Sequence, residues 1–182
     1  MKLEGLLSEI ETRRSDLIQL TCDLVRIPTI NPPGKDYKRI CEFLSNRLTR
    51  SGFDCQIKRA EGAIGDSDLY PRYNLIARHE GFRSGDCIHF NSHTDVVEPG
   101  YGWTKDPFAA VIEEDRIFGR GACDMKGGLA SILLQLKLLL PFVLIIVVRS
   151  KSQLLLMRKQ EVSVGWLGLQ RKVISIRRGF SM

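Results

Sequence analysis

Apolar residues recur at helical spacing along the first part of the chain. Between residues 3 and 25 they are three or four positions apart, which predicts an amphipathic helix that Pro28 ends. A second helix is predicted over residues 37–48, where Ile40, Phe43, Leu44 and Leu48 share one face. Both segments therefore have one side suited to packing on a core.

Three shorter segments have strand character. They cover residues 53–59 (FDCQIKR), 73–79 (YNLIARH) and 86–93 (DCIHFNSH), and turn-forming residues separate them. A last helix is predicted over residues 129–140, after the glycine-containing turn GRGACDMKGG. Helices combined with short apolar strands predict a layered α/β domain.

Charge is unevenly distributed along the 182 residues. Residues 1–140 are close to neutral, whereas residues 141–182 contain eight Lys and Arg and only Glu161 as an acid. The net charge of +6 therefore belongs to the last part of the chain, and it gives no reason to expect nucleic acid as a partner of the rest.

The five cysteines are widely spaced and form no CxxC pair, so no disulfide framework is predicted. The first residues mix acids and bases and lack the apolar stretch of a secretory signal. Both observations favour the reducing cytoplasm as the location.

Three histidines are present, and His93 is the one placed to bind a ligand. His89 and His93 lie four positions apart on a predicted strand, about 13 Å, so they cannot share one metal ion. His89 is expected to be a packed or hydrogen-bonded core residue, and His79 has the same interpretation. His93 instead closes its strand, where open α/β sheets place their ligand crevice.

Two aspartates accompany His93. Asp95 follows by two residues and could accept the second ring N–H of His93, or simply form a turn. Asp124 lies between glycines and the last helix, where its carboxylate could bind metal or cap the helix. The residues alone leave these alternatives open.

Several longer motifs resemble one enzyme family. The strings FNSHTDVV, GWTKDPF and GRGACDMKGG, with LVRIPTINPPG and EGAIGDSDLYPRYNLIA before them, are similar to the dinuclear zinc deacylase and aminopeptidase family. That family includes acetylornithine deacetylase, succinyl-diaminopimelate desuccinylase and related carboxypeptidases. The similarity extends from about residue 10 to residue 140.

The resemblance implies a role for each motif residue. His93 and Asp124 would bind zinc, Asp124 bridging two ions and forming a cis peptide with Met125, and Asp95 would be the catalytic-site residue that orients His93. The GWTKDPF motif, with Trp103 and residues 106–108, would form the wall between these motifs. Paired zinc ions, replaceable by Co²⁺, would activate water for hydrolysis of the amide of a small N-acyl amino acid, with a glutamate as general base. Intact members are expected to be homodimers in the cytoplasm.

The second half of the family pattern is not readable. A Glu-Glu pair, a further acidic ligand, a distant histidine and an inserted domain are all expected after residue 140, and the sequence there contains none of these features. We therefore expect a truncated layered catalytic domain of a zinc-dependent exopeptidase-like hydrolase over residues 1–140. Residues 141–182 are expected to be a non-native basic tail, and the chain as written to be inactive.

A shifted reading frame explains this tail. With synonymous codons chosen for the comparison, DNA that encodes residues 157–176 gives DEEAGGFGGVAWLAEKGYFN when it is read from one base earlier. This string contains a Glu-Glu pair and is similar to the next segment of the family. The hypothesis is that the frame slips near residue 140.

Two other classes of protein remain as alternatives. A membrane-associated fragment would rest on the apolar run LLLPFVLIIVV, which has 11 residues and a proline, against about 20 residues needed to span a bilayer. A noncatalytic binding module would rest on an exposed sheet edge. We expect neither a membrane nor nucleic acid to be the partner.

Overall fold

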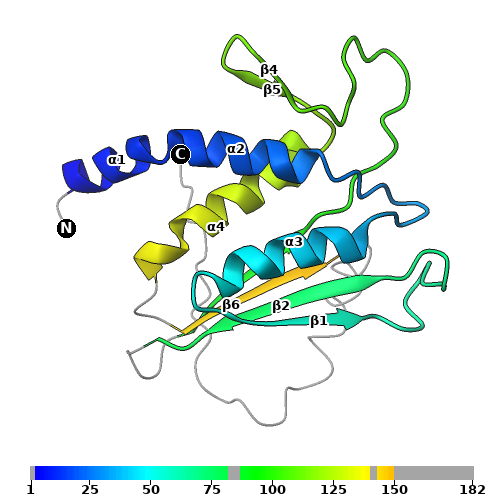
Figure 1. The fold of residues 1–182 in the computed structure, drawn as a ribbon, viewed down its shortest axis with the longest axis horizontal. Coiled ribbons are helices and arrows are strands. Elements are labelled where there is room, and N and C mark those ends of the chain that lie inside the picture. Colours follow the sequence, from blue (N-terminus) through cyan, green and yellow to red (C-terminus); the bar gives the residue numbers. More distant parts are fainter. Residues whose placement is uncertain (1–2, 82–86, 140–142, 150–182) are drawn as a thin grey trace, which may run out of the picture.

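A four-stranded sheet with helices packed on one face forms the domain (Figure 1). The computed structural model describes residues 3–81, 87–139 and 143–149. Its elements are, in chain order, α1 (Leu3–Thr12), α2 (Arg14–Val25), α3 (Tyr37–Thr49), β1 (Asp54–Arg59), β2 (Tyr73–His79), β3 (Cys87–His93), β4 (Val111–Glu113), β5 (Arg116–Phe118), η1 (Ala122–Lys126), α4 (Gly127–Leu139) and β6 (Val143–Arg149). The predicted α/β class is confirmed.

The segment predicted as one helix over residues 3–25 is two helices. The break falls at Arg13, within the run ETRRSD, which offers no apolar side chain to a core. The Arg13 guanidinium forms an ion pair with Glu9 and donates to the carbonyl oxygen of Leu134 in α4. The polar break therefore still contacts a neighbouring helix.

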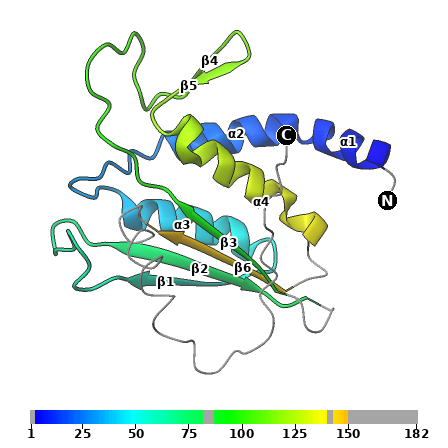
Figure 2. The same cartoon turned by 180° about the vertical axis from the view of Figure 1, so that it is seen from behind.

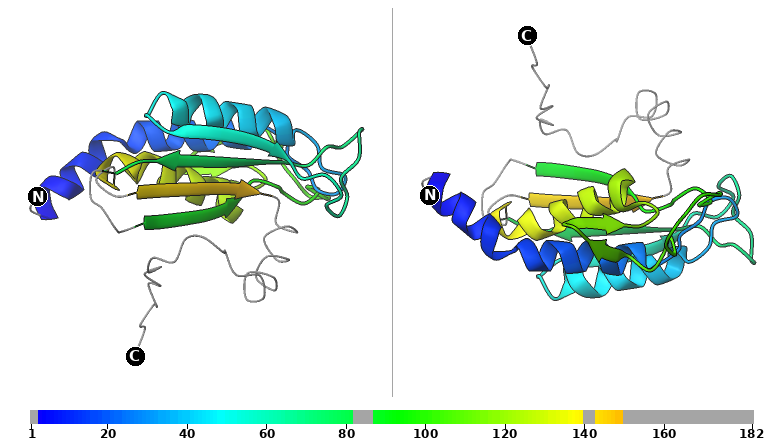
Figure 3. Two further views of the ribbon diagram at one scale, coloured as in Figure 1. Left: turned by 90° about the horizontal axis from the view of Figure 1, so that it is seen from below. Right: turned by 90° about the horizontal axis from the view of Figure 1, so that it is seen from above.

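The sheet has the strand order β1-β2-β6-β3. β1 and β2 are antiparallel, β2 and β6 are antiparallel, and β3 and β6 are parallel. β3 and β6 lie side by side, with α4 beside them (Figure 2). The described helices all lie on one face of this sheet, as the views along it show (Figure 3).

Alternation along the strands builds the core between sheet and helices. α3 buries one face against this core at three- and four-residue spacing, as predicted. The strands contribute alternate residues, since their side chains point to opposite faces. The largest buried contributors are Leu20, Leu24, Ile40, Leu44, Leu75, Leu129, Leu144 and Ile146.

β6 corrects the expectation for part of the tail. Residues 143–149 were expected to lie outside the native domain, yet they form a strand between β2 and β3 with Leu144, Ile146 and Val148 buried. The run VLIIVV suits such a position, because β-branched and apolar residues are typical of buried strands. Residues 150–182, which include the rest of the predicted tail and Glu161, lie outside the described residues.

The β4–β5 hairpin has no counterpart in the sequence prediction. Its two central residues, Glu114 and Asp115, both have positive φ, 48° and 60°, which is the geometry of a tight hairpin turn. Asn-Gly or Asp-Gly is the usual signal for this turn, and Glu-Asp does not match it. The three-residue strands were also too short to show alternation.

Candidate metal centre

The carboxyl end of β3 brings His93 to the edge of the sheet. His93 is the last residue of this strand and is only 5% exposed, and Thr94, Asp95 and Val96 after it are also buried. Parallel pairing with β6 places the carboxyl ends of both strands at this edge, where α/β sheets bind their ligands. His93 therefore takes the predicted position.

Asp124 reaches the same place from the turn before α4. Its Oδ1 atom lies 3.1 Å from Nε2 of His93, and 66% of its side chain is exposed. The peptide bond between Asp124 and Met125 is cis, as the resemblance implied. Two side chains of types that ligate metal ions, 31 residues apart in sequence, thus face each other.

Asp95 lies on the opposite edge of the imidazole ring. Its Oδ1 atom is 3.4 Å and its backbone oxygen 3.3 Å from Nδ1 of His93. An Nδ1–H donated to Asp95 leaves Nε2 directed at Asp124 with its lone pair. The side chain of Asp95 thus occupies the place from which it would orient His93.

Close packing holds the Asp124 turn against the β3 end. A Cβ atom on Gly121, whose φ is 86°, would lie 2.4 Å from a methyl carbon of Val96, so only glycine fits there. The backbone N–H of His93 also donates to the sulfur of Met125, at 3.4 Å. Gly121 of GRGACDMKGG therefore allows this motif to pack closely against the motif that contains His93 and Val96.

Lys126 lies buried beside this turn. Its Nζ donates to the carbonyl oxygen of Ile27, at 2.7 Å, which ties the turn to the end of α2. Burial lowers the pKa of Lys126 from 10.5 to about 8, while the carboxylates of Asp36 and Asp95 act in the opposite direction. No motif or spacing in the sequence pointed to this lysine as a buried residue.

The GWTKDPF segment is attached to the same turn through Arg120. The Arg120 guanidinium lies 5.4 Å from the centre of the Trp103 ring and donates to the oxygen of Pro99, which also accepts the indole N–H. The backbone N–H of Arg120 donates to Pro107, and Asp106 accepts from the N–H of Phe108. The predicted wall residues are thus anchored to Arg120, in the segment that leads into the Asp124 turn.

The other two histidines lie elsewhere. His89 is exposed on β3, so the expectation that it belongs to the core is wrong: residues 88 and 90 of the strand face the helices, and residue 89 faces away. His79 is half-buried with its ring 5.1 Å from that of Phe53, in agreement with a packing role.

His93 and Asp124 fit part of a metal centre. Their facing atoms belong to the ligand types that zinc prefers, and Asp95 supplies the partner that a metal-binding imidazole normally has. Within residues 3–81, 87–139 and 143–149, no cluster of three or more His, Cys, Asp or Glu side chains could hold a metal ion. These residues therefore bring two candidate ligands together but do not form a complete metal site.

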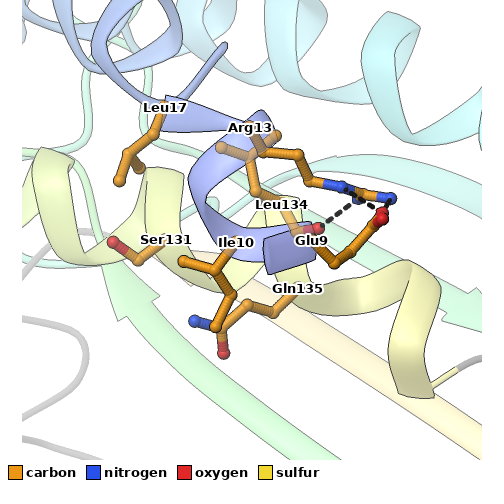
Figure 4. Close-up of a pocket in the computed structure, with 7 residues that line it drawn as sticks. All are labelled: Glu9, Ile10, Arg13, Leu17, Ser131, Leu134 and Gln135. Atoms are coloured by element: carbon orange, nitrogen blue, oxygen red, sulfur yellow. Dashed lines mark hydrogen bonds and ion pairs between the residues drawn. The ribbon is translucent and has the colours of Figure 1, made fainter. Parts of the chain in front are cut away.

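A separate surface groove lies between the N-terminal helices and α4 (Figure 4). It is lined by Glu9, Ile10, Arg13, Leu17, Ser131, Leu134 and Gln135. None of the three metal-centre residues borders it.

None of the helices in the described ranges has the length and apolar character needed to cross a bilayer.

Comparison with known proteins agrees with this geometry. Residues 89–142 match the profile of Peptidase family M20/M25/M40. Succinyl-diaminopimelate desuccinylase of Gluconobacter oxydans is 40% identical over 116 residues, which are 64% of this chain and 28% of that protein. This chain therefore spans little more than a quarter of the relative's length.

Solved structures share the fold at low identity. Human carnosine dipeptidase 1 superimposes with a TM-score of 0.71 at 18% identity, covering 89% of this chain and 38% of that one. An M20 family metallo-carboxypeptidase of Sulfolobus solfataricus gives a TM-score of 0.63 at 22% identity, covering 74% and 30%. The resemblance seen in the sequence is confirmed: residues 89–142, which contain His93, Asp95 and Asp124, match the model of Peptidase family M20/M25/M40.

Proposed function

We propose that this chain carries the first half of the catalytic centre of a metal-dependent hydrolase that cleaves the amide bond of N-acyl amino acids. The observation that carries the proposal is the 3.1 Å approach of His93 Nε2 to Asp124 Oδ1, with Asp95 behind the ring. The name of the Gluconobacter relative supports a substrate of the succinyl-diaminopimelate type, and the resemblance of the sequence motifs adds the acetylornithine type.

Each of the three residues has a distinct task in this proposal. His93 offers the Nε2 lone pair as a ligand, and Asp124 offers two carboxylate oxygens that suit a bridging position between two zinc ions. Asp95 holds the proton on Nδ1 and so keeps Nε2 available. Bound Zn²⁺, or Co²⁺ in its place, supplies the activation of water and the polarisation of the amide carbonyl.

The chain as written is proposed to be inactive. His93 and Asp124 alone leave most coordination positions of two ions to water, and within the described residues no third His, Cys, Asp or Glu completes a metal site. With the synonymous codons chosen above, the shifted frame over residues 157–176 encodes the Glu-Glu pair that would supply the general base and a further ligand. We propose that the frame slip near residue 140 separates the two halves of the active site.

The remaining parts of the proposal concern setting and partners. We propose a cytoplasmic enzyme with a small N-acyl amino acid as substrate, homodimeric when the second half is present. The free thiols of Cys22, Cys41, Cys55 and Cys123 support the reducing compartment.

Metal affinity of the purified chain tests the site directly. We expect weak binding of Zn²⁺, and a loss of at least about tenfold in Asp124→Ala, because even the outer partners of metal ligands contribute that much. His89→Gln is the matched control, since His89 is exposed on β3 away from Asp124, and its affinity should equal that of the wild type. Equal affinity in Asp124→Ala and wild type would contradict the proposed site.

A further inference from the structure

Asn31, in the loop after α2, connects Asp95 to a buried arginine. Its Nδ2 donates to Oδ2 of Asp95 at 3.0 Å, and its Oδ1 accepts from Nη1 of Arg72 at 2.9 Å. Both residues lie outside the segment that matches the peptidase family. A continuous series of contacts thus runs from Arg72 through Asn31 and Asp95 to His93.

Arg72 decides which way the Asn31 amide points. A guanidinium only donates hydrogen bonds, so the amide atom that faces it must be the oxygen. The amide nitrogen is then turned toward Asp95 and donates to Oδ2. This leaves Oδ1 of Asp95 for the Nδ1 side of His93, at 3.4 Å.

Arg72 occupies a cradle that fixes its guanidinium. The side chain is 4% exposed and also donates to the Tyr37 hydroxyl and to the carbonyl oxygens of Pro33 and Gly65, all at 3.0 Å. A Cβ on Gly34 would lie 2.3 Å from Nη1, and one on Gly65 would lie 2.4 Å from Nη2. Both glycines also have positive φ, so the backbone conformation and the close contact with Arg72 each favour glycine at these positions.

The backbone of Asn31 is tied to the strand end that carries Asp95. Its N–H donates to the oxygen of Val96 at 2.8 Å, and the N–H of Val96 donates to Thr29 at 2.9 Å. Ile30 and Val96 form a parallel bridge between these hydrogen bonds. The side chain of Asn31 is therefore held beside Asp95 by its own main chain.

We propose that Asn31 and Arg72 are positioning residues for the metal centre: they fix the Asp95 carboxylate, which keeps the His93 proton on Nδ1 and turns Nε2 toward Asp124 and a divalent ion. The inference rests on the proposed function for the identity of the ligand. Asp95 is 6% exposed, and a buried carboxylate oxygen without a donor is costly, so Asn31 supplies the hydrogen bond that Oδ2 of Asp95 needs.

Asn31→Asp removes the donor to Asp95 and keeps an oxygen for Arg72. The matched control is Thr21→Val, which removes the hydrogen bond of the buried Thr21 hydroxyl to Leu17 in α2 and leaves Asn31 and the contacts of Arg72 unchanged. With three histidines in the chain, ¹⁵N-histidine labelling gives few ring signals, and His93→Gln assigns those of His93. All spectra are taken on the metal-free chain in an Asp124→Ala background, because the Asp124 carboxylate 3.1 Å from Nε2 would compete with Asp95 for the ring proton, and they report which ring nitrogen carries it.

In this background we expect Nδ1 to carry the proton with Asn31 intact and with Thr21→Val, and Asn31→Asp to shift it wholly or partly to Nε2. Zn²⁺ affinity of the chain with Asp124 intact, measured by competition with a chromophoric chelator, should fall about tenfold in Asn31→Asp, the usual loss for an outer partner of a ligand, and stay within about twofold of wild type in Thr21→Val.

An unchanged tautomer and affinity in Asn31→Asp would overturn the inference, and so would equal losses in Thr21→Val, which would indicate general loosening of the domain. If Asn31→Asp does not fold, the same readouts on Asn31→Ala decide. If wild type binds no Zn²⁺, the proposed metal site fails, while the ring nitrogens still decide whether Asn31 positions His93.

Discussion

At the scale of single residues, the imidazole of His93 is held on both of its edges. Asp95 lies at Nδ1 and Asp124 at Nε2, and Asn31 and Arg72 support the Asp95 side. The three motif residues were predictable because each stands at a strand end or a glycine turn in a long motif. Asn31 and Arg72 lie within the motifs LVRIPTINPPG and EGAIGDSDLYPRYNLIA, but their roles were not predictable, because the contacts that define these roles cross 64 and 41 residues.

Buried and exposed cysteines should differ in reactivity. Burial raises the pKa of Cys41 to about 12, and the neighbouring Glu42 adds to the effect, so its thiol stays neutral. Cys123 is exposed. Because the thiolate is the nucleophile, we expect iodoacetamide at about pH 8 to modify Cys123 well before Cys41, as peptide mapping would show. Rapid modification of Cys41 in the folded chain would contradict its burial in the core.

The same shift sets the sign of a pH dependence. The folded-state pKa of Cys41, about 12, lies above its ordinary value of 9.0, so this stabilising contribution is complete below pH 9.0 and is lost as pH rises toward 12. The free energy of unfolding should therefore fall more steeply above pH 9.0 in the wild type than in Cys41→Ala. If urea unfolding gives parallel curves of unfolding free energy against pH for the wild type and Cys41→Ala, this prediction is wrong.

At the scale of elements, β6 lies between β2 and β3 in the sheet, a position that the hydrophobic pattern did not predict. Three of the strands and two of the helices were predicted from periodicity within a few residues of their bounds. β6 was assigned to the tail because its charge and motif context differ from the rest of the chain, and an uninterrupted apolar run has no period that identifies a strand. Its partners, β2 and β3, decide its position through pairing that spans the whole domain.

Truncating a side chain of β6 tests that position. Ile146 is fully buried, and Ile146→Ala should lower the free energy of unfolding by about 2–5 kcal/mol, the usual cost of a cavity left by a large aliphatic residue. Ile112→Ala in β4 is the matched control, because Ile112 is 55% exposed and should change stability by at most about 0.5 kcal/mol. Urea unfolding that shows equal, small effects for both variants would exclude β6 from the core.

At the scale of the whole molecule, the domain brings together His93, Asp95 and Asp124, which we propose to be one half of a catalytic centre. These three residues lie within residues 1–140, whereas the sheet also needs β6 between β2 and β3, and the resemblance supplied the roles of the three residues. In the proposed account the remaining ligands are encoded in the shifted frame and beyond it, so they cannot be derived from this sequence. The matched residues cover 28% of the Gluconobacter relative.

Turnover by the frame-restored protein tests the central claim most directly. Restoring the frame near residue 140 should join the Glu-Glu segment to His93 and Asp124 and extend the chain through the missing ligands. We predict hydrolysis of N-succinyl-diaminopimelate or N-acetylornithine that needs Zn²⁺ or Co²⁺, disappears on chelation and on Asp124→Ala, and persists in His89→Gln. Full activity of the restored protein after Asp124→Ala, or no activity with either substrate when it is folded and metal-loaded, would contradict the account.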